Sequence, residues 1–119
     1  MPIADFAKGL QELGLLIEQT GENRVVFDYV IKAGKFKDQK IKMGFEVPPD
    51  FNLNPPHGPH FTPRLLPINP SSPKHTERVH ESPFGTDWEH LSRPFPNWHK
   101  SRRTVKEYMR YMDYLFEIL

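Results

Sequence analysis

The sequence contains no cysteine among its 119 residues. Disulfide bonds, zinc held by cysteine and a thiol nucleophile are therefore excluded for the chain as written. No apolar run comes near the ~20 residues that a membrane-spanning helix requires. The N-terminus also lacks the basic segment and apolar core of a signal peptide. We therefore expect no membrane partner and a cytoplasmic location.

An excess of charge of one sign is missing as well, because 16 Lys and Arg stand against 15 Asp and Glu. The formal net charge of +1 gives no reason to expect a nucleic-acid partner. A length of 119 residues suits one domain with one core, so we expect residues 1–119 to form a single domain.

Proline is unevenly distributed along the chain. Twelve of the 13 prolines fall between Pro48 and Pro96, and residues 99–119 contain neither proline nor glycine. Residues 48–98 therefore cannot contain a long helix, since each proline removes a donor and restricts the backbone. The same segment holds six aromatic residues, which indicates an irregular segment packed onto a scaffold rather than a linker. These residues are Phe51, Phe61, Phe84, Trp88, Phe95 and Trp98.

The first 47 residues carry patterns of regular structure. Helical spacing of apolar residues predicts a short helix over 3–13, which ends near Gly14. Residues 24–32 are rich in β-branched and aromatic side chains and predict a central strand. Residues 40–47 alternate, so one face of a second strand should be buried and the other wet. A further strand over 61–69 is restricted by its prolines to an edge or an irregular course.

The last segment carries the clearest helix signal. Thr104 and Glu107 fit a capping box, and apolar residues follow at three- and four-residue steps. These are Val105, Tyr108, Met109, Met112, Leu115, Phe116 and Leu119. The order predicts an α+β fold, with an N-terminal helix, an antiparallel meander sheet, a long Pro-rich irregular segment and a C-terminal helix.

This order, with a proline pair before an aromatic residue, resembles the ubiquitin-conjugating (UBC) fold. Pro55-Pro56 precedes Phe61, and Asn69 lies eight residues further on, the family's spacing between its aromatic and its asparagine. The family's His-Pro would fall on Pro67-Ile68, so that pair is absent. The family's cysteine would fall near residues 76–77 and is absent too.

A narrower group, the bacterial UBC-like prokaryotic family E, is more similar. Its Trp-x-x-aromatic-Ser-Arg/Trp-His stretch resembles residues 88–93, followed by a second tryptophan, Trp98, and a final helix. Leu91 and Pro94 depart from this pattern, where the family commonly has an aromatic residue and a histidine. The resemblance implies a UBC-like fold in a bacterial ubiquitin-like modification pathway, in some cases one of antiphage defence. The implied partners are a ThiF-type activating enzyme and a ubiquitin-like protein, with a JAB-type metalloprotease commonly encoded nearby.

The resemblance also implies roles for particular positions. The first helix would meet the activating enzyme, Asn69 would orient the site and help to stabilise an oxyanion, and the groove from Asn69 to Ser82 would take the modifier's tail. Thioester transfer needs a thiolate, which this chain lacks, so the resemblance implies docking instead. Two alternatives stay open. In the first, the chain is a variant whose native cysteine has been replaced, at Ser71, Ser72 or Ser82. In the second, Asn69 forms an Asx turn and has no role in the site.

Histidine is enriched in the Pro-rich segment and gives the second set of candidates. Imidazoles suit proton transfer near neutral pH, so His75 and His80 join Asn69 as catalytic candidates, with His60 beside them. A rival interpretation is a histidine-based or metal-dependent enzyme that uses this cluster. Histidines in loops can also be structural. The six are His57, His60, His75, His80, His90 and His99.

Zinc is one form of that rival interpretation. The pairs at 57/60 and 75/80 could supply ligands together with Glu77 or Glu81. Their spacing fits no strong zinc signature, so we assign no metal and no cofactor.

The aromatic residues near Arg93 give the last candidates. One interpretation is an arginine that stacks on Trp88 or Trp98 and holds a carboxylate of a ubiquitin-like tail. The other is that both tryptophans anchor the Pro-rich segment to the core. The binding candidates are His60, Trp88, Ser92, Arg93 and Trp98. An interaction module without any link to ubiquitin chemistry is a further alternative.

Overall fold

The computed structural model describes residues 2–65 and 79–119. Two helices, six strands and a short 3-10 helix occur in this part of the chain. In order they are α1 (Pro2–Glu12), β1 (Ile17–Gly21), β2 (Arg24–Val30), β3 (Lys40–Glu46), β4 (His60–Thr62), β5 (Val79–Ser82), β6 (Gly85–Leu91), η2 (Trp98–Lys100) and α2 (Val105–Ile118).

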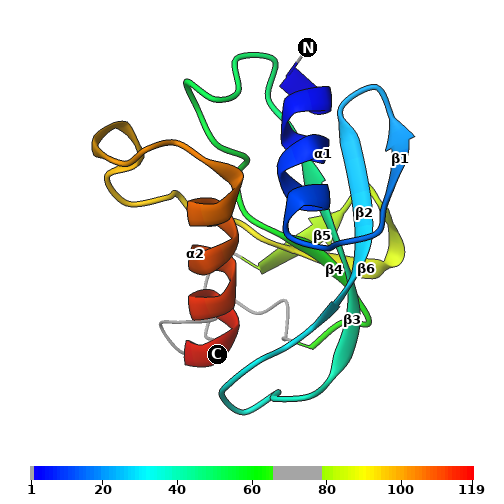
Figure 1. Ribbon diagram of the computed structural model, residues 1–119. Helices are drawn as coiled ribbons and strands as arrows, with labels where there is room; N and C mark the ends of the chain where they lie inside the picture. Colours follow the sequence, from blue (N-terminus) through cyan, green and yellow to red (C-terminus); the bar gives the residue numbers. More distant parts are fainter. Residues whose placement is uncertain (1, 66–78) are drawn as a thin grey trace.

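All six strands form one antiparallel sheet in the order β1-β2-β3-β4-β6-β5. The first four strands are a meander, in which each strand pairs with the next along the chain. A final hairpin, β5–β6, joins this meander through β6, so β5 lies at the edge (Figure 1). The predicted α+β class is therefore confirmed, with an antiparallel sheet whose strands lie between the two terminal helices in the sequence.

Both helices pack on the same face of the sheet (Figure 1). On α1, Phe6 meets the ring of Phe45 edge-on, with ring centroids 5.4 Å apart. On α2, Tyr108 approaches the same ring at 5.3 Å, and Phe116 approaches Phe61 on β4 at 5.3 Å. The core therefore lies between the helices and one face of the sheet. The predicted inward positions of β3 and the residue after it are buried, namely Ile41, Met43, Phe45 and Val47.

The helix ends form where the sequence predicts them. Gly14 has a φ of +84°, a conformation that glycine adopts without strain, and it follows the last turn of α1. At the start of α2, the Thr104 side chain accepts a hydrogen bond from the Glu107 backbone N–H at 3.2 Å. The Glu107 carboxylate accepts from the backbone N–H of Arg102 at 3.2 Å, so this half of the cap reaches further upstream than a capping box does.

The Pro-rich segment 48–98 is more regular than its composition predicts. Of the strand expected over 61–69, β4 covers residues 61–62 and ends directly before Pro63, while residues 66–69 lie outside the described residues. The segment also contains the hairpin β5–β6. The expectation of a largely irregular segment is thus wrong for residues 79–91, because Pro83 lies in the hairpin turn and leaves both strands free of proline. The described part of the segment contains no α-helix, and the 3-10 turn η2 begins only at its last residue, Trp98.

Anchoring of the segment to the core is confirmed for Trp98. Its side chain is buried, and its indole N–H donates to the Asn52 carbonyl at 3.0 Å. A second anchor is the buried hydroxyl of Tyr108, which donates to the Pro56 carbonyl at 3.2 Å and accepts from the Gly58 N–H at 3.1 Å. Across residues 2–65 and 79–119, no helix is long and apolar enough to cross a membrane.

Candidate functional site on the outer face of the sheet

Three histidines form a row across the sheet face that points away from the helices, here called the outer face. Strand pairing sets His60 on β4 opposite His90 on β6, and His90 opposite His80 on β5. On the other side, His60 pairs with Gly44 of β3. Because paired residues of antiparallel strands share a face, the four residues form one continuous row. The hairpin thus brings two of the sequence-predicted site residues, His60 and His80, to the same face.

His60 lies in this row between Gly44 and His90 and is 2 % exposed. Its ring lies against His90 in a nearly parallel stack, with centroids 3.9 Å apart, and against Phe84 at 4.5 Å. Its Nδ1 lies 2.8 Å from the Ser82 hydroxyl oxygen, and its Nε2 lies 3.6 Å from a carboxylate oxygen of Glu46. Every polar atom of the ring therefore faces a protein partner.

The surroundings of His60 set its protonation state. The Ser82 hydroxyl oxygen accepts the backbone N–H of Phe84 at 3.1 Å and shares a hydrogen bond with Nδ1 of His60, whose direction depends on the ring tautomer. Burial, followed by the nearby His90 and Arg24, lowers the pKa of His60 to about 3. His60 is thus a neutral, fixed imidazole at physiological pH.

The hairpin turn covers His60 with an aromatic ring. Phe84 lies directly over Gly44, where a β-carbon would come within 2.7 Å of its Cε2 atom. The same ring stacks on Trp88, with centroids 5.2 Å apart, and carries the Arg24 guanidinium 5.2 Å from its centre. Because Gly44 has no side chain, the turn between β5 and β6 has room to fold onto the outer face. We call the group of Arg24, Gly44, His60, Ser82, Phe84, Trp88 and His90 the outer-face cluster.

His90 and His80 are more accessible than His60. His90 donates from Nε2 to the His57 carbonyl at 3.2 Å, and burial lowers its pKa. The His80 ring lies 6.3 Å from the His90 ring and is exposed. Both can meet a molecule that approaches the outer face.

The remaining predicted residues lie elsewhere. Trp98 packs on the helix side against Phe95, with centroids 4.9 Å apart, so the two tryptophans lie on opposite sides of the sheet. Arg93 donates from its backbone to the His57 carbonyl at 3.0 Å and from its guanidinium to the Ser92 carbonyl at 2.8 Å. Asn69 and His75, together with Ser71 and Ser72, fall outside the described residues.

The alternative of a zinc site gains no ligand set here. Within residues 2–65 and 79–119, no group of three or more histidine, aspartate or glutamate side chains could hold a metal ion. His75 and Glu77, which the alternative also needs, are outside this part of the chain.

The sequence does not predict four members of the outer-face cluster as site residues. Arg24, Gly44, Phe84 and His90 become neighbours only through the strand order. Ser82 pairs with Gly85 across the turn at Pro83-Phe84, and this turn alone would pair residue 80 with residue 87. The observed pairing of His80 with His90 arises from a register shift between Glu81 and Ser82, which the turn residues do not predict.

Comparison of the chain with protein-family models, with curated proteins and with solved structures found no match in any of the three.

Chemically, the outer-face cluster is better suited to contact than to proton transfer. A general base works best when its pKa lies near the working pH, whereas the pKa of His60 is about 3. Stacked aromatic and imidazole rings around a fixed arginine offer a rigid, amphipathic surface of the kind that anchors protein partners.

Proposed function

We propose that this chain is a UBC-like protein of a bacterial ubiquitin-like modification pathway. It binds a ThiF-type activating enzyme or the ubiquitin-like protein in the cytoplasm and forms no thioester. The observation that carries this proposal is a helix followed by a four-stranded antiparallel meander in a chain without cysteine. The motif at residues 88–93 and Trp98 supplies the link to the prokaryotic family E.

The outer-face cluster supports a docking role rather than acyl transfer. Its central imidazole is buried and neutral, and Ser82 is engaged by both His60 and the Phe84 backbone. A serine held in this way keeps its turn closed. Trp88 and His90, together with the neighbouring His80, would touch a partner.

The test mixes the purified chain with the activating enzyme and ubiquitin-like protein of the same genome, together with ATP. We expect a non-covalent complex on size-exclusion chromatography with light scattering, and no shifted band on a non-reducing gel. A shifted band that hydroxylamine removes would overturn the docking proposal, because hydroxylamine cleaves both thioesters and oxyesters.

A variant pair tests the surface itself. Trp88→Ala removes an accessible ring from the outer-face cluster and should weaken the complex by about tenfold or more. Tyr114→Ala removes an exposed aromatic ring of α2, on the other side of the molecule, and should leave the affinity unchanged. Equal losses for the two variants would contradict docking through the outer face.

A histidine-dependent hydrolase is the second candidate, and the 2.8 Å contact between Ser82 and His60 is the observation that favours it. With Glu46 beyond Nε2, the three side chains follow the order nucleophile, base and carboxylate. Labelling by a fluorophosphonate probe that disappears in Ser82→Ala but persists in Ser101→Ala would support this candidate. Absence of labelling in the wild-type chain would reject it.

A further inference from the structure

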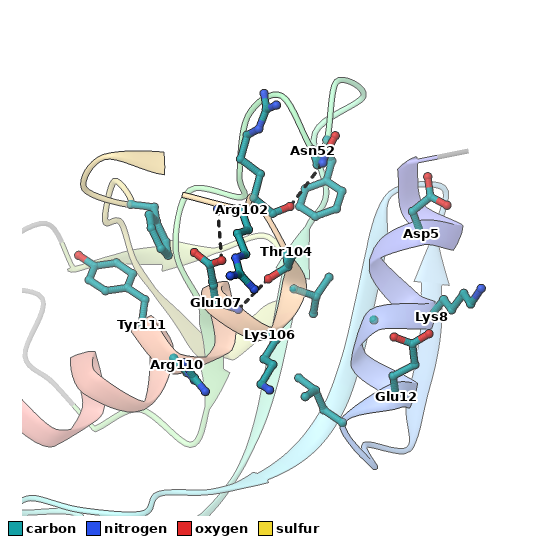
Figure 2. Close-up of a pocket in the computed structure, with 16 residues that line it drawn as sticks. Asp5, Lys8, Glu12, Asn52, Arg102, Thr104, Lys106, Glu107, Arg110 and Tyr111 are labelled. Carbon is teal, nitrogen blue, oxygen red and sulfur yellow. Dashed lines mark hydrogen bonds between the residues drawn. The ribbon is translucent and has the colours of Figure 1, made fainter. Parts of the chain in front are cut away.

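A cleft of about 1340 Å³ lies between α1 and the N-terminal half of α2, on the helix side of the molecule (Figure 2). At its base, α1 and α2 approach closely. A β-carbon at Gly9 would come within 2.6 Å of the Val105 β-carbon. The rim is completed by Asn52, whose side chain donates to the Arg103 carbonyl at 3.4 Å. The cleft is therefore a feature of the packed helices and lies apart from the outer-face cluster.

One wall of the cleft is strongly cationic. Arg102, Lys106 and Arg110 are spaced four residues apart, which places them along one side of α2 and its cap, and Arg103 adds a fourth positive charge. None of the four forms an ion pair with any residue in 2–65 or 79–119. Glu107 is the only acidic residue on this wall among the described lining residues, and its carboxylate accepts the Arg102 backbone N–H.

The opposite wall has a different character. Figure 2 shows Asp5, Lys8 and Glu12 on α1, across the cleft from Lys106 and Arg110 of α2, with the Lys8 side chain extended away from α2. The two carboxylates and one ammonium give this wall a net charge of −1. The cleft is thus polarised, with positive charge along α2 and weak negative charge along α1.

Apolar surface adjoins the cationic wall, and Figure 2 shows Tyr111 beside Glu107 and Arg110, on the side of α2 away from α1. Phe51, Phe95 and Tyr111 line the cleft and are each partly exposed. The Phe95 ring meets Tyr111 edge-on, with centroids 5.0 Å apart, so this surface is ordered by its own packing. A ligand for the cleft should combine negative charge with an apolar side chain.

We propose that this cleft binds an acidic polypeptide segment of a partner protein that also carries an aromatic or aliphatic side chain. Its carboxylates would meet Lys106 and Arg110, and its apolar side chain would rest on Tyr111. Charge complementarity favours a peptide over a nucleic acid. A peptide can set uncharged residues beside Asp5 and Glu12, whereas these carboxylates would repel the continuous phosphate backbone of a nucleic acid. This proposal stands without the UBC-like assignment, since only the cleft's own residues carry it.

The test measures fluorescence anisotropy of a labelled peptide of alternating Glu and Phe residues, titrated with the full chain. We expect saturable binding that weakens with added salt. Lys106→Glu/Arg110→Glu should weaken it by about tenfold or more, while the matched reversal Lys35→Glu/Lys37→Glu, in the loop between β2 and β3, should change it by less than about twofold. Circular dichroism confirms that both variants fold.

Two further measurements sharpen the outcome. Asp5→Asn/Glu12→Gln removes negative charge from the α1 wall and should tighten binding of the Glu-Phe peptide. The analogue peptide with Gln in place of Glu should not bind. The proposal is overturned by equal losses in the two charge-reversal variants, by the absence of saturable binding, or by tighter binding of an oligothymidine than of the peptide.

Discussion

The imidazole of His60 lies parallel to the imidazole of His90, with ring centroids 3.9 Å apart and an angle of 10° between the ring planes. Two cationic rings would repel each other at this separation, so the stack requires at least one neutral ring. Burial lowers the pKa of both residues, and that of His60 falls to about 3. The outer-face cluster is therefore built for neutral imidazoles.

This relationship predicts a pH-dependent stability. In the unfolded chain, His60 binds a proton near its ordinary pKa of 6.5, whereas in the folded chain it does so only near 3. Between these values the unfolded state holds more protons, so the free energy of unfolding should fall as the pH decreases, by up to about 1.4 kcal/mol per pH unit for one such group. Urea unfolding at a series of pH values from neutral to mildly acidic measures this slope.

The control for this prediction is a variant pair. His60→Gln should flatten the slope even if it also lowers stability, whereas His99→Gln, an exposed residue of η2, should leave the slope as in the wild type. Identical slopes for the wild type and His60→Gln would contradict the assignment of a buried neutral His60.

Gly44 and Phe84 should be coupled energetically. A β-carbon at position 44 would approach Phe84 Cε2 to 2.7 Å, so Gly44→Ala must displace the ring and should destabilise the fold by about 1–3 kcal/mol. In a Phe84→Ala background the same change should cost little, because the obstructing ring is gone. A double-mutant cycle of urea denaturation midpoints checks this, and additive effects would contradict the packing described.

The Tyr108 hydroxyl should contribute to stability through two buried hydrogen bonds. Tyr108→Phe leaves the Gly58 N–H and the Pro56 carbonyl without their partner and should cost about 1–3 kcal/mol. Tyr114→Phe, at an exposed ring of the same helix, should be close to neutral. Chemical denaturation of both variants decides, and equal stabilities would show that the hydroxyl contributes nothing.

Gly9→Ala should destabilise the helix pair despite the higher helix propensity of alanine. The gain in propensity is about 1 kcal/mol at most, whereas the new β-carbon would come within 2.5 Å of Val105 Cγ2 and push α1 from α2. We expect a net loss of about 1–2 kcal/mol. Gln11→Ala, at an exposed position of α1, should be neutral or stabilising. A higher melting temperature for Gly9→Ala would contradict the close approach.

Local patterns predicted the helices and the first strands well. The spacing of Phe6 and Leu10, the glycine at position 14 and the cap at Thr104 all act within a few residues, so they can be read from the sequence alone. The alternation of Met43 and Phe45 likewise predicted the buried face of β3.

The outer-face cluster could not be predicted in the same way. Its contacts join residues that are far apart in the sequence, such as Gly44 with Phe84, and they depend on β6 rather than β5 pairing with β4. Strand order is decided by the packing of the whole sheet, which no local pattern reports. The prolines around the hairpin also predict irregular structure there, and its strands contain few β-branched residues.

The strand order leaves β1 and β5 at the two margins of the sheet, with five and four residues respectively. Each margin offers few unpaired backbone groups, and each bears a carboxylate, Glu18 on one and Glu81 on the other. Short, charged margins disfavour lateral association between copies of a chain. The protein can thus present an aromatic surface on the sheet while its margins resist edge-to-edge aggregation.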